Sequence, residues 1–410
     1  MKRTEISKLK PGKVLAEGFI DSLRDTKALV FLVIRDASGM VQVTIKKDKS
    51  PELAELVLGG LQLESTLKVW GELVENASVK LNGVEIIPDK IEVTSFAKVS
   101  PIDEGSSPDL LMDYRWLDLR NEEKRGWFQM QTKVLRAIRE WFVDNGYIEI
   151  MTPKLSAFTT EGGSEVFEVK YFDRKAYLTQ SPQLFKQMAI SAGFEKVFEI
   201  GGCYRAEKSH TARHAAEFFA LDVELGHVAD EHCAMDAEES MLRYVFKKVF
   251  NEDLPKFPRV TLKEVFDLLG KPQDVDLSPD DERALCVLAK EKWNSDFIFV
   301  TQFPFRARAF YSMKRDDDPT ICRGFDLLFK GVEITSGAQR EHRPENLRQN
   351  MRERGINPKD MEFYIQFFEY GCPQHGGYAL GIGRLMAKIL NTPSIKDTTF
   401  LFRGPDRLAP

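Results

Sequence analysis

The stretch VFEIGGCYRAEKSHTARHAAEFFALDVE, residues 197–224, decides how the rest of the chain is interpreted. It begins as an apolar run, breaks at a Gly-Gly pair, passes through a charged middle and returns as an apolar run. This pattern predicts two strands joined by a long loop. Arg205 and Glu207 fall on the first strand, and Arg213 and His214 fall near the end of the loop. Such a hairpin could clamp a polyanion, whereas a solvated charged loop is the alternative for this stretch taken alone.

Length and composition bound the class of protein. A chain of 410 residues is long enough for two or three domains. With 43% hydrophobic and 30% charged residues, the composition fits a soluble globular protein. The net charge of -5 argues against nucleic acid coating the whole surface, but it leaves a local basic face open. Because no apolar run reaches the roughly 18–20 residues that span a bilayer, we expect no membrane association.

The five cysteines are scattered along the chain without a CxxC pair. They are Cys203, Cys233, Cys286, Cys322 and Cys372. This spacing predicts neither a zinc cluster nor a disulfide framework, and it favours a cytoplasmic location.

Four further motifs indicate what this hairpin does. They are TPKL at 152–155, QSPQLFKQ at 180–187, GVEITSGAQREHR at 331–343 and GGYALGIGR at 376–384. Together with YRAE and TARHAAEF, these motifs resemble those of the class II aminoacyl-tRNA synthetases. The resemblance is nearest to the aspartyl enzymes of the archaeal and eukaryotic type, which some bacteria carry as a second, shorter form. It covers nearly the whole chain, with the motifs in the family's order.

The resemblance implies an ATP-dependent, AMP-forming ligase. Such an enzyme activates L-aspartate to aspartyl-adenylate and transfers the aspartyl group to the 3' end of tRNA(Asp). We also hypothesise use of tRNA(Asn), because the loop DSLRDTKA at 21–28 lacks the bulky aromatic residue of some strict relatives. Two alternatives remain. One is an asparaginyl-tRNA synthetase or a related tRNA-independent asparagine synthetase, and the other is a non-catalytic RNA-binding paralogue.

Residues 1–100 show the alternation of a small β-barrel. The candidate strands are 14–24, 29–36, 39–45, 66–74 and 84–95. A short helix at 51–63 follows the third strand, which predicts an OB-fold that binds oligonucleotides. The resemblance makes this barrel the anticodon-binding domain, with Phe31 stacking on a base and Gln42 and Glu85 reading base edges.

Residues 101–125 lose periodicity and predict a hinge, after which residues 126–410 form the catalytic domain. We expect an α+β fold with an antiparallel sheet of six or seven strands flanked by helices, and a helical insertion at about 227–295. A long amphipathic helix begins near 126 and stops at Asn145-Gly146. In the resembling enzymes this helix and Pro153 form a homodimer interface, although a core helix of a monomer is the alternative.

The resemblance also assigns an aspartate pocket. Glu161 would meet the α-ammonium group of the substrate from a glycine-rich loop, and Gln183 would hold its backbone. Lys186 and Arg340 would bind the side-chain carboxylate, with Ser336 nearby. Asparagine lacks that carboxylate, so two cations in the pocket favour aspartate.

The ATP site follows from the same resemblance. Arg205 would bind the α-phosphate and, with Arg384, serve as a catalytic residue that stabilises developing charge. The remaining ATP-binding roles fall to Glu207 and Phe218 on the adenine, Arg213 and His214 on the outer phosphates, and Glu333.

Acidic residues near phosphates point to a metal ion. Asp326 and Glu333 lie on two predicted antiparallel strands, and with the Ser336 hydroxyl they could hold Mg2+ between phosphate oxygens. The sequence departs from the family at Gly383, where many relatives have glutamate, and at Ala338, where glycine is commoner. Neither departure removes a residue assigned to ATP or aspartate.

Overall fold

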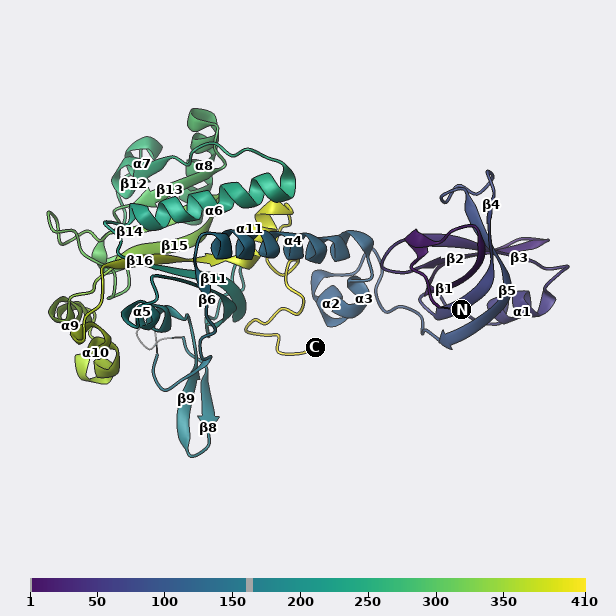
Figure 1. The fold of residues 1–410 in the computed structure, drawn as a ribbon, viewed down its shortest axis with the longest axis horizontal. Helices are drawn as coiled ribbons and strands as arrows, with labels where there is room; N and C mark the ends of the chain where they lie inside the picture. Colours follow the sequence, from purple (N-terminus) through teal and green to yellow (C-terminus); the bar gives the residue numbers. More distant parts are fainter. Residues whose placement is uncertain (1, 160–164) are drawn as a thin grey trace. The chain divides into compact units, whose positions relative to one another are not determined.

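Alternating apolar residues build the N-terminal barrel, whose five strands close on themselves in the order β1-β2-β3-β5-β4. The computed structural model describes residues 2–159 and 165–410 and divides into two units, Met1–Ser107 and Pro108–Pro410 (Figure 1). The barrel strands are β1 Gly12–Asp25, β2 Leu29–Arg35, β3 Met40–Lys46, β4 Thr66–Glu75 and β5 Val84–Ser95. Helix α1, Pro51–Leu58, follows β3, and the short helix η1, Ile6–Lys8, precedes β1. The predicted barrel is therefore confirmed.

The second unit is built on an eight-stranded sheet with the order β12-β13-β14-β15-β16-β11-β10-β6. Its strands are β6 Ile148–Glu149, β10 Lys196–Tyr204, β11 Glu217–Gly226, β12 Arg259–Thr261, β13 Phe297–Thr301, β14 Gly324–Phe329, β15 Val332–Arg340 and β16 His375–Gly381. The α+β class is confirmed, but the sheet has more strands than expected and is mixed. Its two edge pairs, β6 with β10 and β12 with β13, are parallel. The outermost strands are too short to leave an alternating pattern in the sequence.

Helices flank this sheet, and a small three-stranded sheet stands beside it (Figure 1). The longer helices are α4 Glu122–Asp144, α5 Gln183–Ser191, α6 His232–Phe250, α7 Leu262–Leu269, α8 Pro279–Trp293, α9 Pro344–Glu353, α10 Glu362–Glu369 and α11 Ile382–Ile389. The short elements are α2 Pro108–Asp113, α3 Arg115–Asp118, η2 Phe305–Ala307, η3 Pro358–Met361, β7 Leu155–Ser156, β8 Glu168–Tyr171 and β9 Arg174–Leu178. None of the helices in the described part of the chain combines the length and apolar character of a bilayer-spanning segment.

Local signals set the ends of the helices that frame the site. Asn121 caps α4 by accepting a hydrogen bond from the backbone of Lys124, and the chain leaves the helix through Gly146 with a φ of +78°. Ser278 and Asp281 form a capping box at the start of α8. Both helices therefore begin or end where the sequence predicts. Part of the predicted hinge, however, forms α2 and α3 within the second unit.

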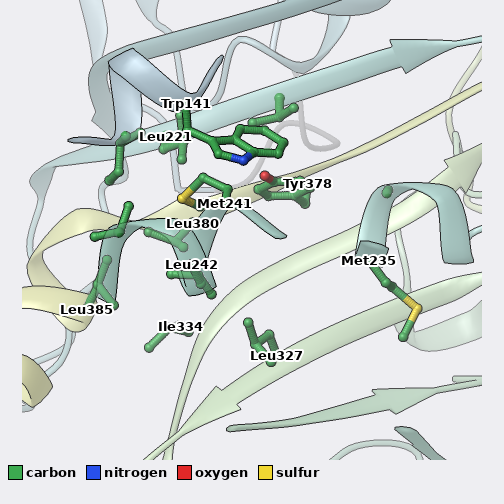
Figure 2. Packing of buried hydrophobic residues seen from close by; sticks show 14 of the residues in the cluster. Trp141, Leu221, Met235, Met241, Leu242, Leu327, Ile334, Tyr378, Leu380 and Leu385 are labelled. Carbon is green, nitrogen blue, oxygen red and sulfur yellow. The ribbon is translucent and has the colours of Figure 1, made fainter. Parts of the chain in front are cut away.

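Strand β11 shows how one sheet carries both a core and a polar face. Its odd-numbered residues, such as Leu221 and Val223, are buried in the main apolar cluster under α4 and α6. Figure 2 shows Leu221 packed with Trp141 of α4 and Met241 of α6. Successive side chains of a strand point to opposite faces, so the even-numbered residues of β11 lie on the other face of the sheet. That face carries the candidate site.

Candidate active site

A cavity of about 160 Å³ lies on the polar face of the sheet. Residues from the β10–β11 connection, β11, β15, β16 and α11 line it. The structure brings together eight of the predicted residues there, namely Arg205, Glu207, Arg213, His214, Phe218, Glu333, Ser336 and Arg384. They come from four segments separated by up to about 180 positions in the sequence, so the fold itself assembles the cavity.

Arg205 stands at the centre of the cavity lining. Strand β10 ends at Tyr204, so Arg205 lies in the loop just beyond the strand on which it was predicted. Its guanidinium packs over the Phe218 ring at 5.3 Å and lies 3.8 Å from the Glu207 carboxylate. Its Nε is buried, and in the described part of the chain no acceptor contacts it. A half-exposed guanidinium with an unused donor fits an anionic ligand.

The opposite wall is a network around Arg213 and Arg384. The Arg213 guanidinium donates two hydrogen bonds to Glu282 of α8, at 2.8 and 3.1 Å. Arg384 donates to the backbone carbonyl of Glu333 at 2.9 Å. Glu282 also accepts from the Glu333 backbone at 3.1 Å, so one carboxylate ties the loop to β15. Burial and the charge of Arg384 lower the pKa of His214, which favours its neutral form near pH 7.

A β-bulge explains why Glu333 and Ser336 both reach the cavity. Residues three apart on a regular strand point to opposite faces. Leu327 pairs with Thr335, but the next residue, Leu328, pairs with Glu333, so Ile334 is the extra residue of the bulge. The bulge turns Glu333 onto the face that carries Ser336.

The predicted metal ligands are only partly available. Arg308 donates to both carboxylate oxygens of Asp326, at 2.8 and 2.5 Å, and to the Ser336 hydroxyl at 2.9 Å. Desolvation and the nearby charge of Asp326 raise the pKa of Glu333 to about 7. A carboxylate beside a second acid is a donor set that suits a divalent cation. Among the described residues no group of three acidic, histidine or cysteine side chains is arranged to hold a metal ion. The Asp326 carboxylate is instead bound by the guanidinium of Arg308.

Two buried ion pairs lie further along β11. Lys186 donates to Asp222 at 3.1 Å and to two backbone carbonyls, those of Val223 and Tyr378. Arg340 donates to Glu224 at 3.0 Å. Each cation therefore already has a carboxylate partner, which differs from the unpaired cations that sequence reasoning expected.

The geometry around these pairs depends on glycine. A Cβ at position 377 would lie 2.0 Å from the Val223 carbonyl and 2.5 Å from the Glu224 carboxylate. Gly377 therefore leaves the room that lets Glu224 reach Arg340. Gln183 of α5 is buried nearby, and its amide nitrogen has no acceptor among the described residues. Glu161, also predicted for this pocket, lies outside the described residues.

The remaining predicted residues are not part of the cavity lining. Pro153 is exposed next to Met151, which is 92% exposed. In the barrel, Gln42 and Glu85 pair across β3 and β5, and Phe31 lies one strand away on β2. The buried Glu85 already accepts from Gln42 and Asn76, so a base would have to replace one of these partners.

Sequence reasoning missed four charged residues of this region. Asp222 and Glu224 had a readable signal, because acids two apart in an otherwise apolar strand point to the same face as Phe218. Glu282 and Arg308 had no such signal. Each is one charge among several in a polar segment, and only the fold brings it to the sheet.

Glu238 of α6 provides a prediction about pH. It is fully buried, accepts a hydrogen bond from Thr335 of β15 at 2.5 Å, and burial raises its pKa to about 8. The native state thus holds a proton that the unfolded state releases above about pH 4.5, so stability falls by at most about 1.4 kcal/mol per pH unit between pH 4.5 and 8. Glu238→Gln should therefore melt a few degrees higher than the parent at pH 8.5, with the gap closing toward pH 5 in thermal melts. A gap independent of pH would contradict this ionisation.

Comparisons with known proteins agree with this architecture. The chain matches the family described as tRNA synthetases class II (D, K and N) over residues 107–403. It matches the OB-fold nucleic acid binding domain over residues 14–94. The two matches cover the sheet unit and the barrel respectively.

Individual relatives are similar over almost their full length. An aspartate–tRNA(Asp/Asn) ligase of Aeropyrum pernix is 37% identical, with 97% of this chain and 96% of the relative covered. An aspartate–tRNA(Asp) ligase of Pyrococcus abyssi is 39% identical over the same shares of the two chains. Among solved structures, asparaginyl-tRNA synthetase of Pyrococcus horikoshii with asparaginyl-adenylate has a TM-score of 0.90, 32% identity and full coverage of both chains.

Proposed function

The chain belongs to the class II tRNA synthetases of the D, K and N group, and we propose that it activates L-aspartate with ATP and transfers it to tRNA(Asp) and tRNA(Asn). The family uses ATP. The observation that carries the choice of aspartate is the pair of buried cations, Lys186 and Arg340, held beside the cavity. The relaxed use of tRNA is supported by relatives whose names include both acceptors.

The activation step needs no protein base. The α-carboxylate of aspartate is ionised at neutral pH and attacks the α-phosphorus of ATP. A carboxyl oxygen–phosphorus bond forms, the bond from the α-phosphorus to the bridging oxygen breaks, and pyrophosphate leaves with the electron pair. Aspartyl-adenylate remains. The protein therefore acts by positioning the reactants and by stabilising charge.

Different cavity residues position the reactants and stabilise the developing charge. Arg205, with its unused Nε donor, binds the α-phosphate and stabilises the charge that builds there. Phe218 and Glu207, on either side of Arg205, hold the adenine. Arg213, His214 and Arg384 face the outer phosphates from the opposite wall. The network around Glu282 fixes two of these cations before ATP arrives.

The aspartate pocket selects its ligand by charge. In the free protein Lys186 and Arg340 are paired with Asp222 and Glu224. A ligand carboxylate replaces a weaker backbone acceptor of Lys186 and approaches Arg340, whereas an amide gains less from the same exchange. By this argument aspartate is preferred to asparagine. Gln183 holds the backbone of the amino acid, and Glu161 is proposed to meet its ammonium group.

Mg2+ is proposed at Glu333, Asp326 and Ser336, where it would neutralise phosphate charge. Because Arg308 occupies Asp326 and Ser336, Arg308→Gln should raise the affinity for Mn2+ without nucleotide by about tenfold, as expected when one competing like charge is removed. Electron paramagnetic resonance of free Mn2+ measures this directly. The exposed neighbour Arg306 provides the control, Arg306→Gln. Weaker binding in Arg308→Gln would contradict the competition.

The barrel is proposed to bind the anticodon through Phe31, Gln42 and Glu85. A homodimer is proposed through α4 and the segment containing Pro153. It is supported by the exposure of Val143 and Met151, apolar side chains at the end of α4 and beside Pro153. Sedimentation velocity of the full chain distinguishes a dimer of about twice 46.9 kDa from a monomer.

ATP–pyrophosphate exchange tests the proposed function. We expect exchange with aspartate and little with asparagine, followed by charging of purified tRNA(Asp) and tRNA(Asn). Exchange with asparagine alone would favour an asparaginyl enzyme, which the similarity to the Pyrococcus horikoshii structure makes the second candidate. Charging of tRNA(Asp) without tRNA(Asn) would remove the relaxed range but keep the aspartyl activity.

A further inference from the structure

A second cavity, of about 390 Å³, adjoins the first behind the wall formed by Arg213, His214 and Arg384. These three residues and Ile395 line both cavities. The rest of the second lining comes from Thr211 and Ala212 of the β10–β11 connection, the start of α8, the turn before β15, the end of α11 and the segment after α11. The predicted ATP and aspartate residues do not account for this space, since most of its lining lies outside the first cavity.

The second cavity is lined by cations. Arg213, Arg283, Arg384 and Lys388 contribute to its lining, and the described lining contains no carboxylate. Three of these cations pair with acids that lie outside the lining: Arg213 with Glu282, Arg283 with Asp280 and Arg384 with Glu333. Four positive charges around one concave space create a potential that attracts a multiply charged anion.

Lys388 is the least compensated of these cations. In the part of the chain that the structure describes, no hydrogen bond or ion pair holds its ammonium group. Burial lowers its pKa, and so does the neighbouring charge of Arg283. An anion in the cavity would oppose this lowering of the pKa, because its negative charge favours the ammonium form of Lys388.

Two features of the chain position the cations. Lys388 follows Arg384 by four residues on α11, so the two side chains lie on the same face of that helix, one turn apart. At the turn between β14 and β15, Gly331 has a φ of +81°, and a Cβ there would lie 3.1 Å from the Arg283 side chain. Glycine at this position therefore serves both the turn and the close approach of α8.

We propose that this second cavity binds the pyrophosphate released in the activation step. The inference rests on the proposed function. The outer phosphates of ATP face Arg213 and Arg384, which also line the second cavity. Pyrophosphate in either cavity would therefore be within reach of the same two guanidiniums. Arg283 and Lys388, which touch only the second cavity, would hold it there while the adenylate stays behind.

Nucleic-acid phosphate is the competing use of such a basic site. The structure favours pyrophosphate, because the cavity shares its wall with the candidate ATP site and its described lining contains no Phe, Tyr or Trp on which a base could stack. The described lining thus offers four cations, with the imidazole of His214 as its one aromatic ring. Pyrophosphate affinity and the KM for tRNA distinguish these two ligands.

Isothermal titration of inorganic pyrophosphate into the full chain tests the proposal. Arg283→Ala and Lys388→Ala should each weaken pyrophosphate binding by roughly fivefold to tenfold, with ATP affinity changed less than about twofold. Arg283→Lys keeps the charge and should retain most of the affinity. Lys292→Ala is the matched control, since Lys292 is an exposed cation of the same helix outside the lining. Thermal melts check that each variant is folded.

Pyrophosphate affinity unchanged in the double variant, Arg283→Ala with Lys388→Ala, would overturn the proposal. A raised KM for tRNA without a change in pyrophosphate affinity would also overturn it, in favour of nucleic-acid phosphate. The titration needs no amino acid. If the wild-type chain binds pyrophosphate through these residues but shows no aspartate-dependent exchange, the proposed function fails while the anion site stands.

Discussion

Arg205→Ala is expected to lower aspartate-dependent ATP–pyrophosphate exchange by about 10²–10³-fold, the loss typical of one preorganised donor at a developing negative charge. Arg205 is suited to that role because its Nε is buried without an acceptor and its guanidinium lies over Phe218 in the cavity. The charge it meets is largest in the transition state. The loss should therefore appear mainly in kcat, with a smaller rise in the KM for ATP.

Two variants sharpen this test. Arg205→Lys keeps the charge but loses the planar fork, so it should recover only part of the rate. Lys208→Ala removes an exposed cation from the same loop and should leave exchange almost unchanged. If Arg205→Ala raised the KM for ATP at constant kcat, Arg205 would contribute to ground-state binding alone, and its assignment as a catalytic residue would be wrong.

The sequence predicted the barrel well because its information is local. Each strand alternates with period two, and turn residues separate the strands. One such turn contains Asn82 and Gly83, which both have positive φ, at 60° and 65°. Such positions favour asparagine and glycine, so the residue types mark the turn.

The sheet of the second unit was predictable in its centre and not at its edges. The long apolar runs around Phe198, Leu221 and Leu327 identify β10, β11 and β14. Strands β6 and β12 have two and three residues, and their pairing is fixed by contacts distant in sequence. The bulge at Ile334 was equally invisible, since it depends on how β14 and β15 meet. A regular strand would put Glu333 and Ser336 on opposite faces of the sheet, so the pattern of the sequence alone does not bring both to the cavity.

The candidate site was also predictable only in part. Residues within motifs, such as Arg205 and Arg384, line one cavity as the motifs suggested. Their partners were not. Glu282 lies 69 positions from Arg213, and Arg308 lies 18 positions from Asp326, in segments without a motif. The sequence therefore pointed to the residues that line the cavity better than to the residues that hold them in place.

Lys186→Met is expected to lower kcat/KM for aspartate by at least about 100-fold, or about 3 kcal/mol, while ATP affinity stays within about twofold. The buried ammonium balances Asp222 and Glu224, so its removal leaves the pocket with excess negative charge that repels the substrate's carboxylate. The same change also destabilises the fold, because a buried acid loses its partner. Steady-state exchange kinetics and thermal melts measure the two effects separately.

A double variant decides between recognition and structural support. Burial raises the pKa of Asp222, and the charge of Lys186 opposes that rise. Combining Lys186→Met with Asp222→Asn removes both charges of the pair and should restore much of the lost thermal stability. It should not restore the use of aspartate, since the ligand's carboxylate still lacks its cation. Recovery of aspartate activation in the double variant would show that Lys186 only neutralises Asp222, and Arg340 would then be the residue that selects the acid.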